Sequence, residues 1–217
     1  MLLNKQIYNY FAKNKLFAKS KYGFRTSKST LDAVCCFVGR CYDGLENGLP
    51  VEGYFFDLTK AFDTVDQEIL LQKLKFYGFD NGSTALLSSY LMNRQQAVYV
   101  NGTFSKFHIL RHGVPQGSVL GPVLFLIYIN DLPACIRDEC LETYMFADDL
   151  AININLNKDV KLIDDIIARV ELWCNSNRLA LNSNKTENIK FSLNRNSCLI
   201  KKSGHSSGVR LGLANSC

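Results

Sequence analysis

The sequence is poor in histidine, lacks paired C-x-x-C cysteines, and has no apolar run long enough to cross a bilayer. It contains three histidines, and none of its eight cysteines forms a C-x-x-C pair, which argues against a zinc site. The longest apolar run, Val119 to Ile129, is interrupted by Gly121 and Pro122 and is too short for a transmembrane helix. We recognise no secretory signal, and therefore expect reduced thiols in an intracellular protein, either nuclear or cytoplasmic.

Acidic residues are missing from two long stretches. From Met1 to Lys28 there are seven Lys or Arg and no Asp or Glu, and residues 81–130 contain no acid either. The acids gather instead at Asp57 to Glu68 and at Asp138 to Asp149. Basic, acid-free tracts beside an acidic focus suit a polyanion bound next to metal ions. Chance clustering of charges on solvated faces is the alternative.

The overall composition is that of an ordinary folded protein. Of 217 residues, 47% are hydrophobic and 21% are charged, which is enough apolar material for a real core. The length predicts one domain, with room for an additional lobe.

Two adjacent carboxylates, Asp148 and Asp149, lie between segments rich in strand-forming residues, Leu141 to Phe146 and Leu150 to Ile154. The pattern predicts a strand, a tight turn and a second strand, with both carboxylates at the tip. An ordinary exposed polar turn is the simplest alternative. If the pair is buried, however, the two like charges require a cation.

A third acid, Asp57, ends a predicted buried strand from Glu52 to Leu58. A calcium loop does not explain it, because Phe62 stands where that loop needs its central glycine. The pattern Thr64-x-x-Gln67 predicts a capping box and a following helix, which accounts for the acids at 63 and 66 but not for Asp57.

Other segments give weaker local predictions. Residues 1–21 favour an amphipathic helix, and residues 22–30 form a Gly/Ser/Thr loop that either holds phosphate or caps a helix through Ser29 or Thr30. Asn101-Gly102 predicts a β-hairpin between residues 97–100 and 103–110. We expect a close-approach loop over 112–122, an apolar helix to about Leu132, a helix over 160–173, and strands at 179–181 and 189–191.

If adjacent strands bring Asp57 beside Asp148 and Asp149, the three carboxylates could hold two Mg²⁺ ions, which prefer oxygen ligands. Such a pair stabilises the attack of a hydroxyl group on a nucleotide α-phosphate.

The chain resembles reverse transcriptases of non-LTR (LINE-type, jockey-like) retrotransposons, and more distantly those of group II introns and telomerase. The stretches that carry the resemblance occur in family order over about residues 1–192: Tyr22-Gly23-Phe24-Arg25, Phe56 to Asp63, Gly113-Val114-Pro115-Gln116-Gly117-Ser118 continuing to Leu132, Phe146-Ala147-Asp148-Asp149, and Asn182 to Thr186.

The resemblance implies an α+β fold of the right-hand polymerase type, in which an antiparallel palm sheet is packed with helices. It implies partial fingers over 1–52 and a palm over 53–192, with a fingers insertion around 81–111. We expect no thumb, and we expect residues 193–217 to be a disordered or unrelated tail. The chain then looks like a fragment of a mobile-element polymerase.

The same resemblance implies roles for single residues. Asp57 and Asp148 would be the main metal ligands, with Asp149 and the backbone carbonyl of Leu58 assisting. Phe62 matches a steric gate that favours dNTPs, although a core aromatic residue is the alternative.

Three further positions match parts of the nucleotide site. Gln116 and Gly117 match the loop beside the incoming nucleotide, and Arg25 matches a contact to the triphosphate. Lys185 matches a proton donor to pyrophosphate, with an exposed turn lysine as the alternative.

The function expected from the resemblance is RNA-directed DNA polymerase activity, with two Mg²⁺ ions, dNTPs, an RNA template and a DNA primer. The alternative is an inactive retrotransposon remnant that at most binds nucleic acid. An RNA-directed RNA polymerase also uses paired aspartates, but Phe62 and the Pro115-Gln116-Gly117 loop argue against it.

Overall fold

The structure, a computed structural model, describes residues 2–155, 160–182, 184–194, 197–202 and 209–210. The chain forms two compact units, each assembled from separate stretches of sequence. The helical unit comprises Met1–Ala18, Thr59–Asp131 and Cys174–Ala180. The sheet unit comprises Lys19–Leu58, Leu132–Trp173 and Leu181–Cys217.

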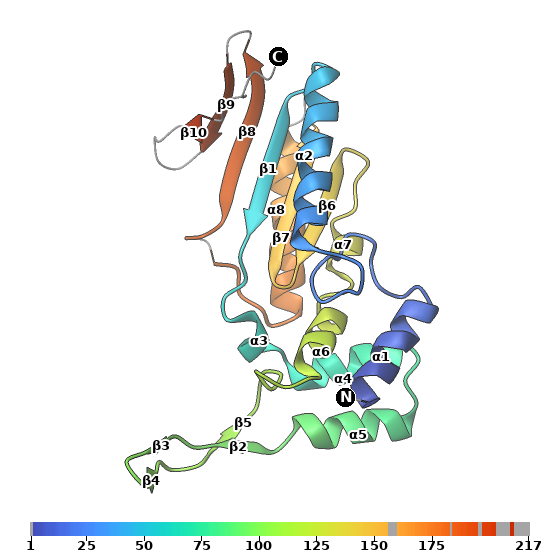
Figure 1. Cartoon of the computed structure of the whole chain (residues 1–217), viewed down its shortest axis with the longest axis vertical. Helices are drawn as coiled ribbons and strands as arrows, with labels where there is room; N and C mark the ends of the chain where they lie inside the picture. Colours follow the sequence, from blue (N-terminus) through green and yellow to red (C-terminus); the bar gives the residue numbers. More distant parts are fainter. Residues whose placement is uncertain (1, 156–159, 183, 195–196, 203–208, 211–217) are drawn as a thin grey trace. The chain divides into compact units, whose positions relative to one another are not determined.

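The sheet unit is built on six antiparallel strands in the order β10-β9-β8-β1-β7-β6. The strands are β1 (Val51–Phe56), β6 (Leu141–Phe146), β7 (Asp149–Asn155), β8 (Glu187–Asn194), β9 (Ser197–Lys202) and β10 (Val209–Arg210). Strand β1 pairs with β7 on one side and β8 on the other, so it lies inside the sheet (Figure 1).

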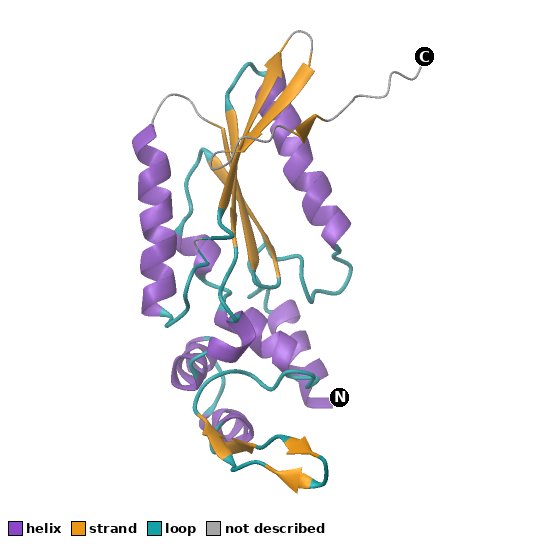
Figure 2. Ribbon diagram, turned by 90° about the vertical axis from the view of Figure 1, so that its left-hand side faces the viewer, coloured by secondary structure: helices purple, strands orange, loops and turns teal. Residues whose placement is uncertain are grey.

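Two long helices cover opposite faces of this sheet, α2 (Thr30–Glu46) and α8 (Val160–Ser176) (Figure 2). Alternation along β1 and β7 sends one set of side chains toward α2 and the other toward α8. The α2 face holds an aromatic core cluster: Tyr22, Ala33, Phe37, Cys41, Val51 and Tyr144. On the other face, Ile152 and Ile154 of β7 are buried, as are Ile166 and Val170 of α8. The sheet therefore has a packed core on both sides.

Helix α2 begins where the sequence places its cap. The hydroxyl oxygen of Ser29 accepts the backbone N–H of Asp32, and the Asp32 carboxylate accepts the N–H of Ser29 at 2.7 Å. This capping box confirms Ser29 as the start of the helix and explains the Ser/Thr content of the preceding loop.

The helical unit contains the remaining elements except α7. These are α1 (Leu2–Lys13), α3 (Ala61–Thr64), α4 (Gln67–Phe76), α5 (Asn81–Leu91), α6 (Gly121–Tyr128), and the strands β2 (Arg94–Gln96), β3 (Tyr99–Val100), β4 (Thr103–Phe104) and β5 (His108–Leu110). The short helix α7 (Leu132–Cys135) belongs to the sheet unit. Helix α6 is almost entirely buried, as its apolar sequence predicts. Among the residues that the structure describes, no helix combines the length and apolarity needed to cross a membrane.

The capping box predicted at Thr64-x-x-Gln67 is wrong. Thr64 ends the short helix α3, and its hydroxyl donates back to the carbonyl of Lys60 at 3.2 Å. Asp66 is the true cap of α4, because its carboxylate accepts the N–H of Ile69 at 2.9 Å. An ionised carboxylate at the positive end of a helix is the stronger acceptor.

The strand predicted at 179–181 is also wrong. Leu179 donates its N–H to the carbonyl of Cys174, closing the end of a helix, and Arg178 before it has a left-handed backbone (φ 52°). Only Leu181 makes a single antiparallel bridge, to Leu58. An apolar triplet is too short for periodicity to separate a helix end from a strand.

Residues 193–217 were expected to form a disordered or unrelated tail, and this prediction is wrong for residues 197–202 and 209–210. They form β9 and β10, which extend the sheet from β8, while the rest of the region beyond Asn194 lies outside the described residues. Such pairing needs only backbone donors and acceptors, so composition does not reveal it. The predicted fingers and palm ranges remain predictions. The compact units are divided differently, because residues 19–58 belong to one unit across the expected boundary at 52.

Candidate active site

Asp57 and Asp149 lie at the same end of two adjacent strands, with Asp148 in the turn beside them. The register pairs Phe56 of β1 with Leu150 of β7, so Asp57 and Asp149 continue the same ladder by one position. By alternation both lie on the face covered by α2. The turn is Ala147-Asp148, and Asp149 is already the first residue of β7, paired with Phe146. The hairpin prediction is confirmed, but only Asp148 lies in the turn.

The Tyr22-Gly23 segment packs against this turn and holds it in place. The N–H of Tyr22 donates to the carbonyl of Met145 at 2.8 Å, at the outer edge of β6. A Cβ at Gly23 would lie 2.3 Å from the backbone nitrogen of Ala147, closer than any real contact. Ala147 itself has a left-handed backbone, with φ of 53°. Gly23 is therefore needed for space, because the turn rests directly on its backbone.

Asn182 orients Asp57, a role that the sequence alone did not predict. The side-chain amide of Asn182 donates to Oδ2 of Asp57 at 3.0 Å, and the backbone N–H of Asn182 donates to the carbonyl of Asp57 at 2.8 Å. Two bonds from one residue fix both the strand end and its carboxylate. The available signal was the position of Asn182, which opens the polar turn that also carries Lys185.

Lys185 lies beside the carboxylates. Its Nζ is 3.5 Å from Oδ2 of Asp57, although 68% of the side chain is exposed. Loss of hydration raises the pKa of Asp149, the charges of Asp148 and Asp57 raise it further, and Lys185 lowers it. Asp149 is nonetheless an exposed residue as a whole. Negative charge thus accumulates at this end of the sheet.

The donor chemistry fits a hard divalent cation, since every candidate ligand is an oxygen and the neighbouring carboxylates repel one another. Within the described part of the chain, however, no three His, Cys, Asp or Glu side chains are gathered closely enough to hold a metal ion. The backbone of the site is therefore assembled, while its side chains are not closed around one point.

A cavity of about 440 Å³ opens beside the carboxylates, between the first turns of α2 and the sheet. Its polar lining includes Asp57, Asp149 and Lys185. Its apolar lining comes from Ala33, Val34, Phe37, Phe55, Phe56, Tyr144, Phe146, Leu150 and Ala151. Arg25 is half-buried in the loop before α2 and is not among the residues that line this cavity.

The other predicted site residues gather in the helical unit. Phe62 stacks on Phe125 of α6 with ring centroids 4.2 Å apart, and it remains partly exposed. The side-chain amide of Gln116 donates to Oδ1 of Asp63 at 2.6 Å. Gly117 beside it is exposed, with φ of 73°. The predicted gate and the predicted loop are therefore neighbours.

Glycine at position 113 is what lets the loop approach α3. Its N–H donates to the carbonyl of Val65 at 2.7 Å, and the N–H of Val114 donates to that of Phe62 at 2.9 Å. Gly113 has φ of 85°, and a Cβ there would lie 2.9 Å from the carbonyl oxygen of Asp63. This confirms a close-approach loop.

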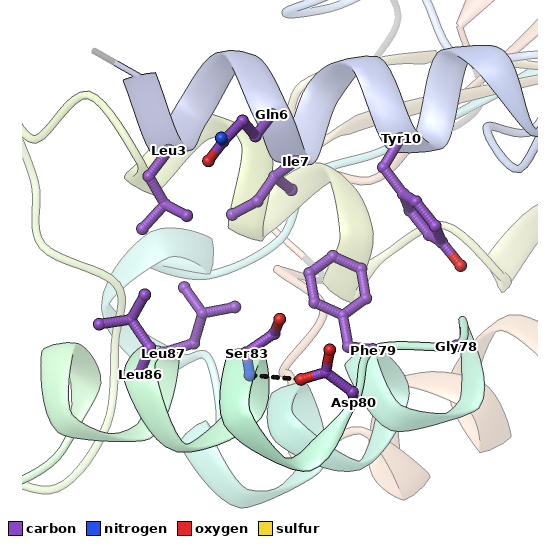
Figure 3. A pocket seen from close by; sticks show the side chains of 10 residues that line it. All are labelled: Leu3, Gln6, Ile7, Tyr10, Gly78, Phe79, Asp80, Ser83, Leu86 and Leu87. Carbon is purple, nitrogen blue, oxygen red and sulfur yellow. Dashed lines mark hydrogen bonds between the residues drawn. The ribbon is translucent and has the colours of Figure 1, made fainter.

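A second cavity, of about 300 Å³, lies between α1 and α5 in the helical unit (Figure 3). It contains none of the predicted site residues. Asp80 on its lining accepts the N–H of Ser83 at 2.6 Å and caps α5. The lining residues that the structure describes are mainly apolar.

Comparison with known proteins identifies the family. Residues 2–212 match the family described as reverse transcriptase (RNA-dependent DNA polymerase). The chain is 29% identical over 208 residues to a "Probable RNA-directed DNA polymerase from transposon BS" of Drosophila melanogaster, covering 88% of this chain and 22% of that protein. It is 28% identical over 193 residues to the RNA-directed DNA polymerase from mobile element jockey of the same species, covering 85% of this chain and 21% of that protein.

Similar solved structures come from telomerase. Apo telomerase of Candida tropicalis, truncated from its C-terminal domain, aligns with a TM-score of 0.68 at 15% identity, over 94% of this chain and 42% of that chain. At this identity the likeness concerns the fold, and it confirms the expected α+β polymerase architecture. The chain spans about a fifth of the length of the transposon relatives. The family match over nearly the whole sequence, with the carboxylates at the ends of adjacent strands, shows that this chain belongs to the reverse transcriptase family.

Proposed function

We propose that this chain is the polymerase region of an RNA-directed DNA polymerase, which transfers deoxynucleotides from dNTPs to the 3′-OH of a DNA primer on an RNA template. The observation that carries the proposal is the meeting of Asp57 and Asp149 on paired strands, with Asp148 in the connecting turn. Membership of the reverse transcriptase family supports it.

Reverse transcriptases use divalent metal ions, and the proposed ligands here are Asp57, Asp148 and Asp149 with the backbone carbonyl of Leu58. Two bound Mg²⁺ ions would supply activation of the primer hydroxyl and neutralisation of the charge on the triphosphate. Loss of hydration and then the charges of Asp148 and Asp57 raise the pKa of Asp149, and a bound cation would relieve that repulsion between like charges. Asn182 holds Asp57 in position through its two hydrogen bonds.

The remaining side chains would handle the nucleotide. The ammonium of Lys185 would donate a proton to the leaving pyrophosphate, and its exposed side chain leaves it free to turn toward a substrate. Phe62 would exclude a ribose 2′-OH, and its stack on Phe125 fixes the ring for that purpose. Gln116 and Gly117 would form the wall beside the nucleotide, and Arg25 would contact the triphosphate.

The test is primer extension on an RNA template with Mg²⁺ and dNTPs. Wild type should extend the primer, and Asp57→Asn or Asp148→Asn should reduce the rate by a factor on the order of 10³ or more. Asp165→Asn is the matched control, because it removes an exposed carboxylate of α8 that pairs with Arg169. If wild type binds primer-template without extending it, the chain is an inactive remnant and the proposal fails.

A second measurement separates metal binding from activity. Titration with Mn²⁺, followed by electron paramagnetic resonance, should show binding that weakens in Asp57→Asn and persists in Asp165→Asn. Substrate choice has its own readout: wild type should discriminate against rNTPs, and Phe62→Leu should relax that discrimination. Efficient incorporation of rNTPs by wild type would instead indicate an RNA polymerase.

A further inference from the structure

The hairpin formed by residues 94–110, here called the outer hairpin, pairs with no other strand among the residues that the structure describes. It consists of two separate two-stranded ladders, β2 with β5 and β3 with β4. It extends away from α5 in the helical unit (Figure 1). A two-stranded hairpin gains little stability by itself in water, so its exposed side chains call for a functional explanation.

Three aromatic rings lie on this hairpin and face solvent. Tyr99, Phe104 and Phe107 are 60%, 61% and 63% exposed. The rings of Tyr99 and Phe104 are 4.6 Å apart across the β3–β4 ladder, and those of Phe104 and Phe107 are 6.2 Å apart and nearly parallel. Val98, Val100 and Ile109 are also exposed. Exposed apolar side chains gathered in this way mark a binding surface.

The charge on the outer hairpin has one sign. The whole stretch 81–130 contains no Asp or Glu, while Arg94, Lys106 and Arg111 lie in or beside the hairpin. The acids nearest its base are Asp66 and Glu68, which share a cavity of about 520 Å³ with Arg111. Asp66 is neutralised there by an ion pair with Arg178.

We propose that the outer hairpin binds single-stranded nucleic acid, with bases stacked on Tyr99, Phe104 and Phe107 and phosphates held near Lys106 and Arg111. Aromatic rings beside cations recognise single strands, because every base has a π-face that stacks and a duplex hides those faces. Protein interfaces also use exposed aromatic residues, so the tests below separate the two kinds of partner. This surface goes beyond the proposed polymerase chemistry and does not depend on it, since its residues are separate from the carboxylates.

The decisive variants replace a ring by an aliphatic side chain. Phe107→Leu and Phe104→Leu keep the surface apolar but remove the flat ring. Phe107 lies between β4 and β5 rather than in a ladder, so its replacement leaves strand pairing intact. Phe107→Trp keeps a stacking surface and is the rescue variant.

The measurement is fluorescence anisotropy of a short labelled oligothymidylate, titrated with the full chain in EDTA, and of a duplex of the same length. Each leucine variant should bind the single strand about tenfold more weakly, with a smaller loss on the duplex, while Phe107→Trp binds like wild type. Leucine variants that bind as tightly as wild type would overturn the proposal. So would an equal loss on both ligands.

The cations have a separate readout in salt. Lys106→Ala and Arg111→Ala should each reduce the slope of log K against log salt by about 0.7, the value for one phosphate contact on a single strand. Lys75→Ala, at an exposed lysine of α4, should leave the slope unchanged. If all three variants lower it equally, binding is diffuse and the proposed site is wrong.

Two controls keep this proposal distinct from the polymerase and from protein docking. The oligothymidylate titration contains neither free Mg²⁺ nor dNTPs, so failure of primer extension does not affect this result, and Asp165→Asn, which removes an exposed carboxylate of α8, should bind like wild type. Sedimentation of wild type and Phe107→Leu tests self-association. A dimer that the leucine variant abolishes, with oligothymidylate binding unchanged, would assign the surface to a second copy of this chain and overturn the proposal.

Discussion

Two hairpins of this chain have two-residue turns with left-handed backbone, but the sequence favours only one of them. In the outer hairpin the turn is Asn101-Gly102, with φ of 49° and 81°, and both residue types adopt that conformation readily. In the inner hairpin, formed by β6 and β7, Ala147 has φ of 53°, where an L-residue with a Cβ is strained. The outer turn is therefore specified locally, and the inner turn is imposed by its neighbours.

The largest effect is expected where the inner turn rests on Gly23. Gly23→Ala places a Cβ 2.3 Å from the nitrogen of Ala147 and should lower the free energy of unfolding by about 3 kcal/mol. Gly102→Ala is the matched change in the outer turn, where nothing lies within 4 Å of the added Cβ. Only backbone strain remains there, about 1 kcal/mol. Urea unfolding of both variants checks this, and equal losses would contradict it.

The next effect concerns the base of the outer hairpin, where Asp66 bridges to His112 and pairs with Arg178 at 2.5 Å. Burial alone would raise the pKa of Asp66, but the N–H of Ile69 and the charge of Arg178 outweigh it and hold that pKa below 3.8. Arg178→Ala should therefore cost about 1–2 kcal/mol at pH 7, since it leaves a buried carboxylate without its cation.

The pH dependence of that loss is fixed in sign. A depressed folded-state pKa contributes stability above the ordinary value of 3.8, and this contribution disappears as pH falls through the folded value. Wild type and Arg178→Ala should thus converge in acid. Arg169→Ala, which breaks an exposed pair on α8, should change stability little at any pH. A difference that persists at low pH would show that Arg178 acts through packing instead.

A smaller effect of opposite sign is expected at the strained residue itself. Ala147→Gly removes the cost of the left-handed conformation but adds freedom to the unfolded chain, so the net gain should be about 0.5–1 kcal/mol. Asn101→Gly in the outer turn should gain less, because asparagine already tolerates that backbone. Thermal unfolding of both variants compares the turns directly. A destabilised Ala147→Gly would mean that its methyl group packs.

The smallest effect on stability is expected at Lys185. Its pair with Asp57 is largely exposed, so Lys185→Gln should change the free energy of unfolding by less than about 0.5 kcal/mol. The same variant should slow primer extension by roughly 10²-fold, as expected for loss of a general acid. Unfolding and extension measured on one preparation separate the two roles. Unchanged extension would leave Lys185 as an exposed turn lysine.

Much of the fold follows from local sequence. The local predictions that failed concern choices that the spacing of residues does not decide. The Ser29 cap, the Asn101-Gly102 turn and the apolar helix α6 depend on residues close in sequence, and all are found. The choice between Thr64 and Asp66 as a cap was decided by the strength of the acceptor, which spacing alone does not reveal.

The positions of the three acids were predictable, but their roles as metal ligands stay a prediction. Asp57, Asp148 and Asp149 stand out in the sequence because acids at the ends of apolar strands are unusual, and the structure places them at one end of β1, β6 and β7. The position of the turn was missed by one residue, since Ala147 is a poor residue for left-handed backbone. The role of Asn182 depends on a contact 125 positions away in sequence, which only the folded chain provides.

Strand β1 lies between β7 and β8, and this has a consequence for how the protein is made. Asp57 leaves the ribosome about ninety residues before Asp149, the first residue of the neighbouring strand β7, and Asn182 follows later still. Pairings across such distances are slow to form and come after local structure. The carboxylate centre therefore exists only once synthesis has passed residue 182, so a nascent chain interrupted earlier presents at most separate, unpaired halves of it.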